Sequence, residues 1–375
     1  MKRGVLPYQM IKDLLDDGKI MVAEYENIQP SGLDVTLSGE IYRLKGISVP
    51  RRDEDFSDFL ERVILCPATL DNPLEVGVPY IIRLNERFAL PTHIRAKASP
   101  KSTVGRSFLH VRLLSERGAV LDRLPGGYEG DIWAMVVSRS FVVQLRRDLA
   151  ISQMRFFSGE PRLGHEEFVA AYNEHPFLWL PVGAPIPFES ITLYDGDGAL
   201  IIRSDLESDI VAWRTRTVQD RVFDFSVPRE TYNPSDFFDA IEKPKSGYLA
   251  LERGRGYILS SYEFVSFSEK YASEMEVSDS GSGDFRVHSA GFFDPGFGYG
   301  SDGSVRGTPA TFEITPYEDN LIFAHKQRAA KMFVEHLSES ADTLYGDVVL
   351  GSSYLFQRGP KLPKQFKEVS RRIER

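Results

Sequence analysis

The chain has 375 residues, of which 42% are hydrophobic, 12% aromatic and 26% charged. This composition is typical of a soluble globular protein and excludes a disordered or fibrous one, and the length predicts two domains of roughly 180 residues each. The formal net charge of -9 argues against a surface for nucleic acid polymers, because binding a phosphate backbone requires clustered Lys and Arg. A small nucleotide needs only a few local cations and is not excluded.

Cys66 is the only cysteine, so the chain can form neither an intrachain disulfide nor a Cys-rich zinc site. His165 begins the only His-x-Glu pattern, and no cysteine pair exists to complete the zinc ligands of a cytidine deaminase. Residues 1–15 hold no long apolar segment, and no stretch approaches the ~20 apolar residues of a membrane span. We therefore expect a cytoplasmic protein with no zinc and no membrane partner.

The first predicted element is a short helix within Leu6–Ile20. Apolar residues in Met10–Leu15 share one helical face, Pro7 stands near the start and Gly18 lies just past the end. Short apolar runs separated by Gly, Pro, Asp and Asn follow, and they predict strands. Four of these runs are Tyr80–Leu84, Trp133–Val137, Phe141–Leu145 and Tyr248–Leu251. Many short strands with few helices predict a mainly β fold, a barrel or a sandwich rather than an alternating α/β sheet.

A second helix is predicted within Gly164–Trp179, and three prolines follow it between residues 181 and 187. We place the domain boundary there, at about residue 185, which gives an N-terminal domain of residues 1–185 and a C-terminal domain of residues 186–375.

The two halves echo each other weakly. Gln29–Asp34 resembles Asn233–Phe238, and a glycine-aromatic pair precedes strands in each half, at Gly127-Tyr128 and at Gly296-Phe297. Two tandem copies of one domain are the simplest interpretation.

Two segments and one carboxylate carry residues suited to chemistry. Lys101–Arg106 places two cations and two hydroxyls, those of Ser102 and Thr103, beside a glycine. Such a set can bind phosphate oxygens, each charge-assisted bond contributing roughly 1.5–3 kcal/mol, although a polar loop would look the same. Ser289–Phe297 places Asp294 between glycines and aromatic residues, and its alternative interpretation is a tight turn in which the aspartate bonds its own backbone.

Glu313 lies in the predicted strand Ala310–Thr315, where it faces the same side as Thr311. A carboxylate in a pocket can have its pKa raised by desolvation, which suits proton transfer near neutral pH. The alternative is a solvent-exposed glutamate on a strand.

Together these segments resemble the dCTP deaminase family, a branch of the dUTPase-like superfamily, in a long form with two copies of the domain. The segments that carry the resemblance are Gln29–Asp34, Lys101–Arg106, Ala290–Phe297, Lys326–Phe333, and Tyr354 with Gln357–Pro360. Ala290–Phe297 matches the family's Ala-Gly-Phe-x-Asp-Pro-Gly-Phe motif almost residue for residue. The resemblance implies tandem dUTPase-like distorted β-barrels or jelly rolls, with a few short helices.

Neither half carries the family's full set of functional residues. The first half has Met135 where the catalytic glutamate is expected, and the second half lacks the phosphate-binding arginine around Ser278–Ser282. Because the family's sites lie between neighbouring domains, the resemblance implies a composite site. The first half would supply Ser102 and Arg106 for phosphates, and the second half would supply Asp294 and Glu313. The loop between these two acids is longer than the family's usual spacing.

The resemblance further implies that dCTP and water give dUTP and ammonia without zinc. Glu313 would be the general base, the backbone near Ala290 would position the water, and Asp294 would accept a hydrogen bond from the 3′-hydroxyl of the deoxyribose. The C-terminal residues implied to close over the nucleotide are Tyr354, Gln357 and Lys361. Mg²⁺ is expected only as a companion of the triphosphate, and a homo-oligomer with sites between domains is expected as the assembly.

Three other functions stay open at this point. A dUTP diphosphatase, or one enzyme with both activities, would use the same nucleotide contacts and would release pyrophosphate. A catalytically silent protein would bind nucleotide tightly without turnover. In an unrelated β-rich interaction module, every motif above would be a turn. A Gly-x-Ser-x-Gly nucleophile motif is absent from the sequence.

Overall fold

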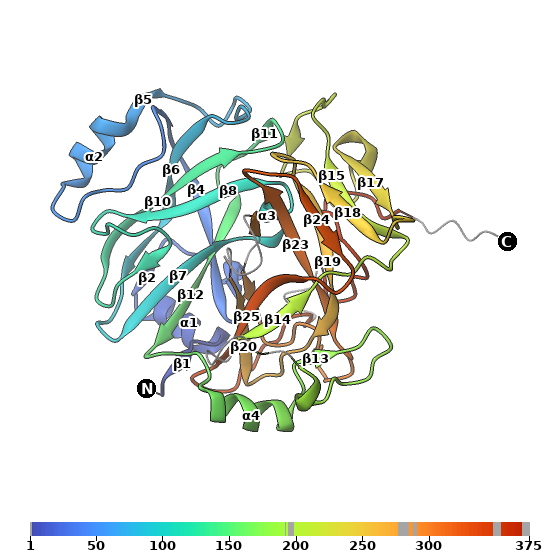
Figure 1. Ribbon diagram of the computed structural model, residues 1–375. Helices are drawn as coiled ribbons and strands as arrows, with labels where there is room; N and C mark the ends of the chain where they lie inside the picture. Colours follow the sequence, from blue (N-terminus) through green and yellow to red (C-terminus); the bar gives the residue numbers. More distant parts are fainter. Residues whose placement is uncertain are drawn as a thin grey trace.

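A computed structural model of the chain describes residues 2–191, 193, 199–276, 285–287, 291–347 and 354–369. Strands dominate, and they form two β-rich lobes that pack against each other (Figure 1). The mainly β fold with a few short helices is therefore confirmed. In the helices of the described residues, no segment is long and apolar enough to cross a membrane.

The first lobe is one sheet in which β8, β10, β6, β4, β12, β7 and β9 are neighbours in that order. β4 (Gly32–Leu44) pairs with β12 (Ala150–Ser158) through its first part and with β6 (Pro79–Ala89) through its second, so it joins the two sides of the lobe. The rest of this order is β7 (Ile94–Pro100), β8 (Leu109–Ser115), β9 (Arg123–Leu124) and β10 (Glu129–Ser138). Short strands pair with β12, β6 and β4: β1 (Gly4–Val5), β2 (Ile20–Met21), β3 (Ile28–Gln29) and β5 (Ile64–Pro67).

The second lobe contains two larger sheets and a two-stranded ribbon. The first sheet is β17 (Phe238–Glu242), β15 (Ile210–Thr215), β19 (Tyr257–Val265), β23 (Thr308–Pro316) and β21 (Phe285–Val287), with β13 (Leu178–Trp179) on β19. The second sheet is β14 (Leu200–Arg203), β25 (Arg328–His336), β20 (Tyr271–Met275) and β22 (Phe292–Phe293). The ribbon is β18 (Tyr248–Leu251) with β24 (Leu321–Ala324).

The lobes repeat one pairing pattern. β14 and β15 pair with β25 and β19 as the two parts of β4 pair with β12 and β6. β23 and β20 then extend these pairs as β10 and β7 do in the first lobe. The echo between Gln29–Asp34 and Asn233–Phe238 does not mark equivalent positions, because the first segment enters β4 whereas the second enters β17. The glycine-aromatic pairs do precede equivalent strands, β10 and β23.

Helices cover the lobes at few places. α1 (Tyr8–Asp16) is the predicted N-terminal helix, and it buries Ile11 and Leu14. α2 (Phe56–Val63) buries Phe59 and Val63 against the first sheet. The remaining short segments are α3 (Ser102–Gly105), η1 (Tyr25–Asn27), η2 (Phe188–Ser190) and η3 (Pro234–Asp236).

α4 (His165–Glu174) packs with the second lobe, although the boundary near residue 185 assigns it to the N-terminal domain. Phe168 and Tyr172 of α4 belong to the second core, together with Leu178 of β13. This packing favours a division of the chain near residue 160, where β12 has ended. The division near residue 185 stays a prediction.

The first lobe completes its core with side chains from the second half of the chain. Phe223, Phe237 and Phe366 are fully or almost fully buried in the first core. The rings of Phe223 and Phe366 stack at a centroid distance of 5.6 Å, and Phe141 of the first lobe meets Phe237 edge-on at 5.2 Å. Backbone pairing adds to this contact, because β11 (Val143–Gln144) runs parallel to β16 (Phe223–Asp224). The two lobes are thus one packed unit.

We expect Phe223→Ala to lower the free energy of unfolding by about 3–5 kcal/mol, the usual cost of truncating a buried ring. Urea titration followed by circular dichroism measures this loss. Phe356→Ala is the matched control, because Phe356 is 74% exposed and its truncation should leave the unfolding free energy nearly unchanged. A loss under about 1 kcal/mol for Phe223→Ala would contradict a shared core.

Candidate active site

The predicted phosphate segment forms the short helix α3 directly after β7. Backbone amides of Gly105 and Arg106 donate to the carbonyls of Lys101 and Ser102 at 2.9 and 3.0 Å, which turns the chain back toward the second lobe. Val104 anchors the turn in the first core. Lys101 then forms an ion pair with Asp34 of β4, and Thr103 shares a hydrogen bond of 2.9 Å with the Tyr354 hydroxyl.

Arg106 and Glu313 meet across the two lobes. Glu313 stands on β23 and is 1% exposed, and its Oε1 lies 3.7 Å from Arg106 Nε. Both side chains are buried, so the pair brings two opposite charges together where bulk water does not reach them. The predicted meeting of first-half and second-half residues is present in the structure within a single chain.

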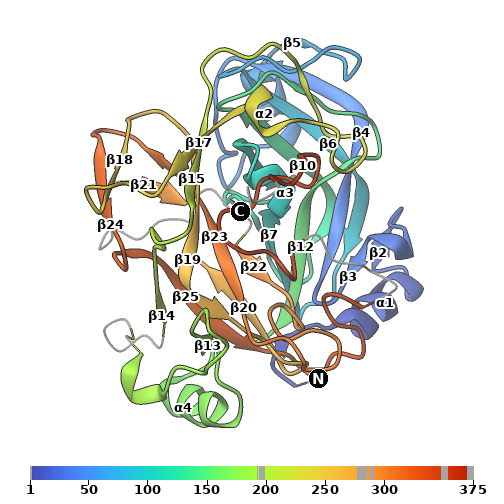
Figure 2. The same cartoon turned by 90° about the vertical axis from the view of Figure 1, so that its right-hand side faces the viewer.

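The C-terminal segment contacts Arg106, and its ribbon passes beside α3 (Figure 2). Arg106 Nη1 donates to Gln357 Oε1 at 3.1 Å and to the Lys361 carbonyl at 2.9 Å, and its guanidinium lies 3.7 Å from the Tyr354 ring centroid. Gln357 Nε2 in turn donates to Thr311 Oγ1 at 3.3 Å. The Lys361 ammonium is directed away from Arg106 and pairs with Glu368.

Thr311 and Glu313 point to the same face of β23, as the alternation of a strand predicts. That face meets Gln357 and Arg106. The alternative of a solvent-exposed glutamate is therefore wrong.

Asp294 follows β22, and its side chain bonds to the first lobe rather than to its own backbone. Its Oδ1 accepts a hydrogen bond of 2.6 Å from Ser31 Oγ and lies 3.5 Å from Arg155 Nη2. Gly296 adopts a φ of +93°, and a Cβ there would lie 2.6 Å from the Tyr345 amide, so this close approach requires glycine. The tight turn is real, but the carboxylate it presents contacts the lobe interface.

Ala290, the predicted water-positioning residue, lies outside the described residues, as does Ser278–Ser282. The amide of the neighbouring Gly291 donates to Ser99 Oγ of β7 at 2.9 Å. Ser102 lies half-buried at the start of α3.

Two buried carboxylates of the first lobe, Asp34 and Glu86, lie on one side of Lys101. Burial chiefly raises the pKa of Asp34, Lys101 lowers it, and the nearby Asp294 carboxylate raises it further. Behind Asp34, Glu86 accepts hydrogen bonds from the Thr36 amide at 3.0 and 2.9 Å and from its hydroxyl at 2.8 Å. Burial raises the pKa of Glu86 to about 7, against the lowering effect of these hydrogen bonds.

Cations gather on the other side of Lys101. The pKa of Lys364 is lowered, first by burial and then by the positive charges of Lys101 and Arg229. The Asp34 carboxylate, which pairs with Lys101, has the opposite effect and raises the pKa of Lys364. The sequence had not singled out Lys364 or Arg229. Ser31 and Asp34 lay within the Gln29–Asp34 signature, which was the available signal for them.

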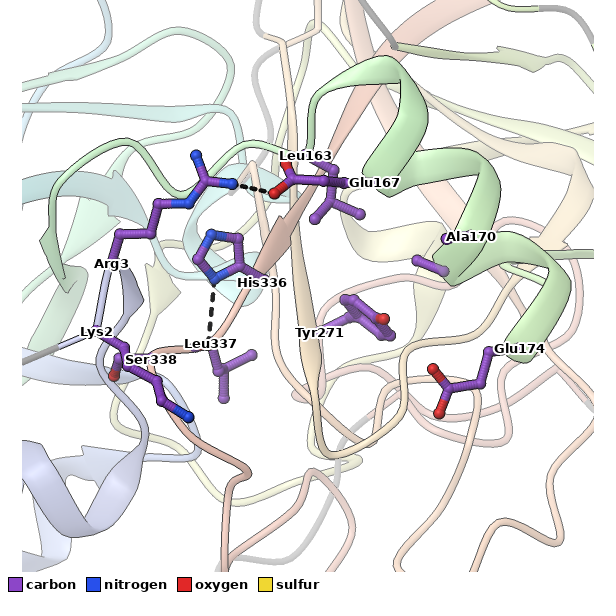
Figure 3. Close-up of a pocket in the computed structure, with 11 residues that line it drawn as sticks. Lys2, Arg3, Leu163, Glu167, Ala170, Glu174, Tyr271, His336, Leu337 and Ser338 are labelled. Carbon is purple, nitrogen blue, oxygen red and sulfur yellow. Dashed lines mark hydrogen bonds and ion pairs between the residues drawn. The ribbon is translucent and has the colours of Figure 1, made fainter.

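Two cavities of the described structure lie elsewhere. One, of about 520 Å³, lies between α4 and the N-terminal residues, where Arg3 contacts Glu167 (Figure 3). Another, of about 470 Å³, lies between the lobes and is lined by cations such as Arg95 and Arg123 and by Glu335. Neither is lined by a predicted site residue. Among the described residues, His, Cys, Asp and Glu form no group of three or more that could hold a metal ion.

The fold is that of a two-lobed β-rich protein, with a buried carboxylate–guanidinium pair at the lobe interface. Family models described as the N-terminal and C-terminal domains of 2′-deoxycytidine 5′-triphosphate deaminase match residues 2–160 and 190–366. The crystal structure of 2′-deoxycytidine 5′-triphosphate deaminase from Agrobacterium tumefaciens is similar over 90% of this chain and 100% of that one, with 28% identity and a TM-score of 0.79. No curated protein sequence matched the chain. The chain belongs to the 2′-deoxycytidine 5′-triphosphate deaminase family.

We expect the free energy of unfolding to fall as the pH rises from about 4.5 to about 7, by on the order of 3 kcal/mol. Glu86 binds more protons in the folded than in the unfolded chain in this window, because its pKa rises from 4.5 to about 7 on folding. Glu86→Gln should remove the part of this fall that Glu86 contributes, and urea titrations at several pH values measure it. Glu75→Gln, at an exposed ion pair with Arg43, should keep the wild-type slope. Equal slopes in Glu86→Gln and wild type would refute the assignment.

Proposed function

We propose that this chain hydrolyses dCTP to dUTP and ammonia at the lobe interface, with Glu313 as the general base. The observation that carries the proposal is the buried contact between Glu313 and Arg106, in a chain whose two halves both match the deaminase family. The reaction adds the water oxygen to C4 of the cytosine ring and then breaks the bond between C4 and the amino nitrogen.

Glu313 takes a proton from the attacking water and delivers it to N3 of the ring. It then takes the proton of the new C4 hydroxyl and delivers it to the leaving amine, so that ammonia departs as the C4 carbonyl forms. Such general acid–base catalysis typically raises the reaction rate by about 100- to 10,000-fold. Tyr354 and Gln357 pack over the pair, which excludes bulk water from the proton transfers. The backbone at Ala290 stays the predicted position of the water.

Arg106 serves Glu313 more directly than it serves phosphates. Its side chain is 5% exposed, and Nη1 is committed to Gln357 and Lys361. We therefore assign triphosphate binding to Lys101 and Ser102, whose ammonium and hydroxyl groups stand at the start of α3 and can bind phosphate oxygens.

Asp294 accepts the hydrogen bond of the 3′-hydroxyl, which selects the sugar. Ser31 and Arg155 occupy Oδ1, and among the described residues no group donates to Oδ2. That oxygen is the one we assign to the nucleotide.

The metal ion, the cellular location and the assembly are part of the same proposal. Mg²⁺ enters with the triphosphate, since a hard cation suits phosphate oxygens and waters. We place the enzyme in the cytoplasm. Association into a homo-oligomer stays a prediction from the family resemblance, and the residues named here all come from one chain.

We expect the purified chain to release ammonia and dUTP from dCTP with Mg²⁺, and Glu313→Gln to lower kcat by roughly 100-fold or more because the general base is lost. Chromatography of the nucleotides with assays of ammonia and pyrophosphate measures both products. Release of dUMP and pyrophosphate would add the diphosphatase activity. Tight binding of dCTP without any product would overturn the proposal in favour of a silent nucleotide-binding protein.

We expect Arg106→Ala to lower kcat by a similar factor for dCTP and for dCMP, because the arginine acts on Glu313 rather than on the outer phosphates. The variant should also lose about 3–5 kcal/mol of unfolding free energy, since it removes one partner of a buried ion pair. Arg112→Ala, at an ion pair with Asp122 whose arginine is 47% exposed, is the control for removal of a guanidinium. A rise of KM confined to dCTP would return Arg106 to the phosphates, and unchanged turnover and affinity would exclude it from the site.

A further inference from the structure

Arg155 is a buried guanidinium that passes from the first lobe into the second. It stands on β12, a strand of the first lobe, and its side chain is 2% exposed. Among the described side chains it belongs to the largest that are fully buried. Burying a guanidinium is unfavourable unless a negative charge and hydrogen-bond acceptors compensate it. The partners of Arg155 therefore indicate its role.

Most of these partners belong to the second lobe and lie around the Asp294 carboxylate. Nη1 donates to Glu335 Oε2 at 2.9 Å and to the Ser273 carbonyl at 3.0 Å. Nη2 donates to the Phe293 carbonyl at 3.1 Å and approaches Asp294 Oδ1 at 3.5 Å. The guanidinium carbon lies 4.4 Å from the ring centroid of Phe292. Arg155 therefore contacts three consecutive residues of β22 and the turn after it, residues 292–294.

Ser31 closes the arrangement from the first lobe. Its hydroxyl donates to Asp294 Oδ1 at 2.6 Å and accepts from Arg155 Nη2 at 3.2 Å. Oδ1 is thus fixed by two groups of the first lobe. These two contacts fix the rotation of the carboxylate, and they therefore also fix the position of Oδ2.

Glu335 holds Arg155 in turn. Its carboxylate is buried, which raises its pKa, while the charge of Arg155 opposes that rise. The guanidinium lies between Glu335 and Asp294, so it cannot move toward one carboxylate without leaving the other. This geometry makes the position of Asp294 depend on a residue of the half that lacks the catalytic glutamate.

We infer that Arg155 is a positioning residue for sugar recognition, acting through Asp294. This inference rests on the proposed function, because it assigns Asp294 to the 3′-hydroxyl of the deoxynucleotide. Arg155 itself does not touch the reacting atoms. Its loss should weaken the contact to the 3′-hydroxyl and leave the chemistry at Glu313 in place.

The test compares dCTP with 2′,3′-dideoxycytidine triphosphate, which lacks the 3′-hydroxyl. We expect Arg155→Met to lower kcat/KM for dCTP roughly 10- to 100-fold, mainly through KM, as loss of a charge-assisted hydrogen bond would. The dideoxy substrate should change little, so the preference for dCTP should collapse. Asp294→Asn should reduce the preference in the same way, and Ser31→Ala should reduce it less.

A double variant separates positioning from stability. Arg155→Met alone leaves Glu335 buried without its partner, so we pair it with Glu335→Gln, which should restore folding but not the preference. Arg203→Met is the control, because Arg203 pairs with Glu263 inside the second lobe and should alter stability while keeping the preference. If Arg155 had only a structural role, its loss would lower kcat/KM for both substrates by the same factor.

The outcomes are distinct for the two proposals. If the double variant keeps the wild-type preference while Asp294→Asn loses it, Arg155 is not the positioning residue. If the wild-type chain deaminates neither substrate, the proposed function fails. In that case calorimetric dissociation constants for the two nucleotides in the same variants still decide the role of Arg155, and an unchanged ratio of constants overturns it.

Discussion

Buried ionic contacts between the lobes constrain the whole structure. Two arginines of the first lobe, Arg106 and Arg155, enter the second lobe and meet carboxylates there. An isolated charge in such surroundings is strongly unfavourable, so each side chain is tolerated only when the lobes are packed in this one arrangement. The turn at α3 and the covering C-terminal segment are both consequences, because they bring Arg106 to Glu313 and keep water from the pair.

The same constraint explains why the two halves have diverged. Met135 on β10 occupies the position that corresponds to Glu313 on β23, and it packs in an apolar cluster with Trp133 and with Phe59 of α2. The first half contributes Arg106 and Arg155 to the lobe interface, and the second half contributes Glu313 and Asp294.

Local patterns predicted the elements well and the contacts between lobes poorly. Helical spacing gave α1, and turn residues gave β18 with its observed ends. The run Phe141–Leu145 forms only the two-residue strand β11, because its phenylalanine is used for packing against the second half. Arg155 lies in no recognisable motif. Its contacts are with residues more than a hundred positions away along the chain, so no local pattern could reveal its role. The resemblance placed Tyr354 and Gln357 at the site, whereas the side chain of Lys361 pairs with Glu368.

The shared aromatic core also bears on how the chain acquires its shape. The strands of the first lobe are synthesised before Phe223, Phe237 and Phe366 exist, yet these rings fill that lobe's interior. During translation, part of the apolar surface of the first lobe therefore stays exposed to solvent until these residues are synthesised. Its folding is coupled to residues as far along the chain as Phe366, and a nascent chain of this kind depends on protection from aggregation until they are synthesised.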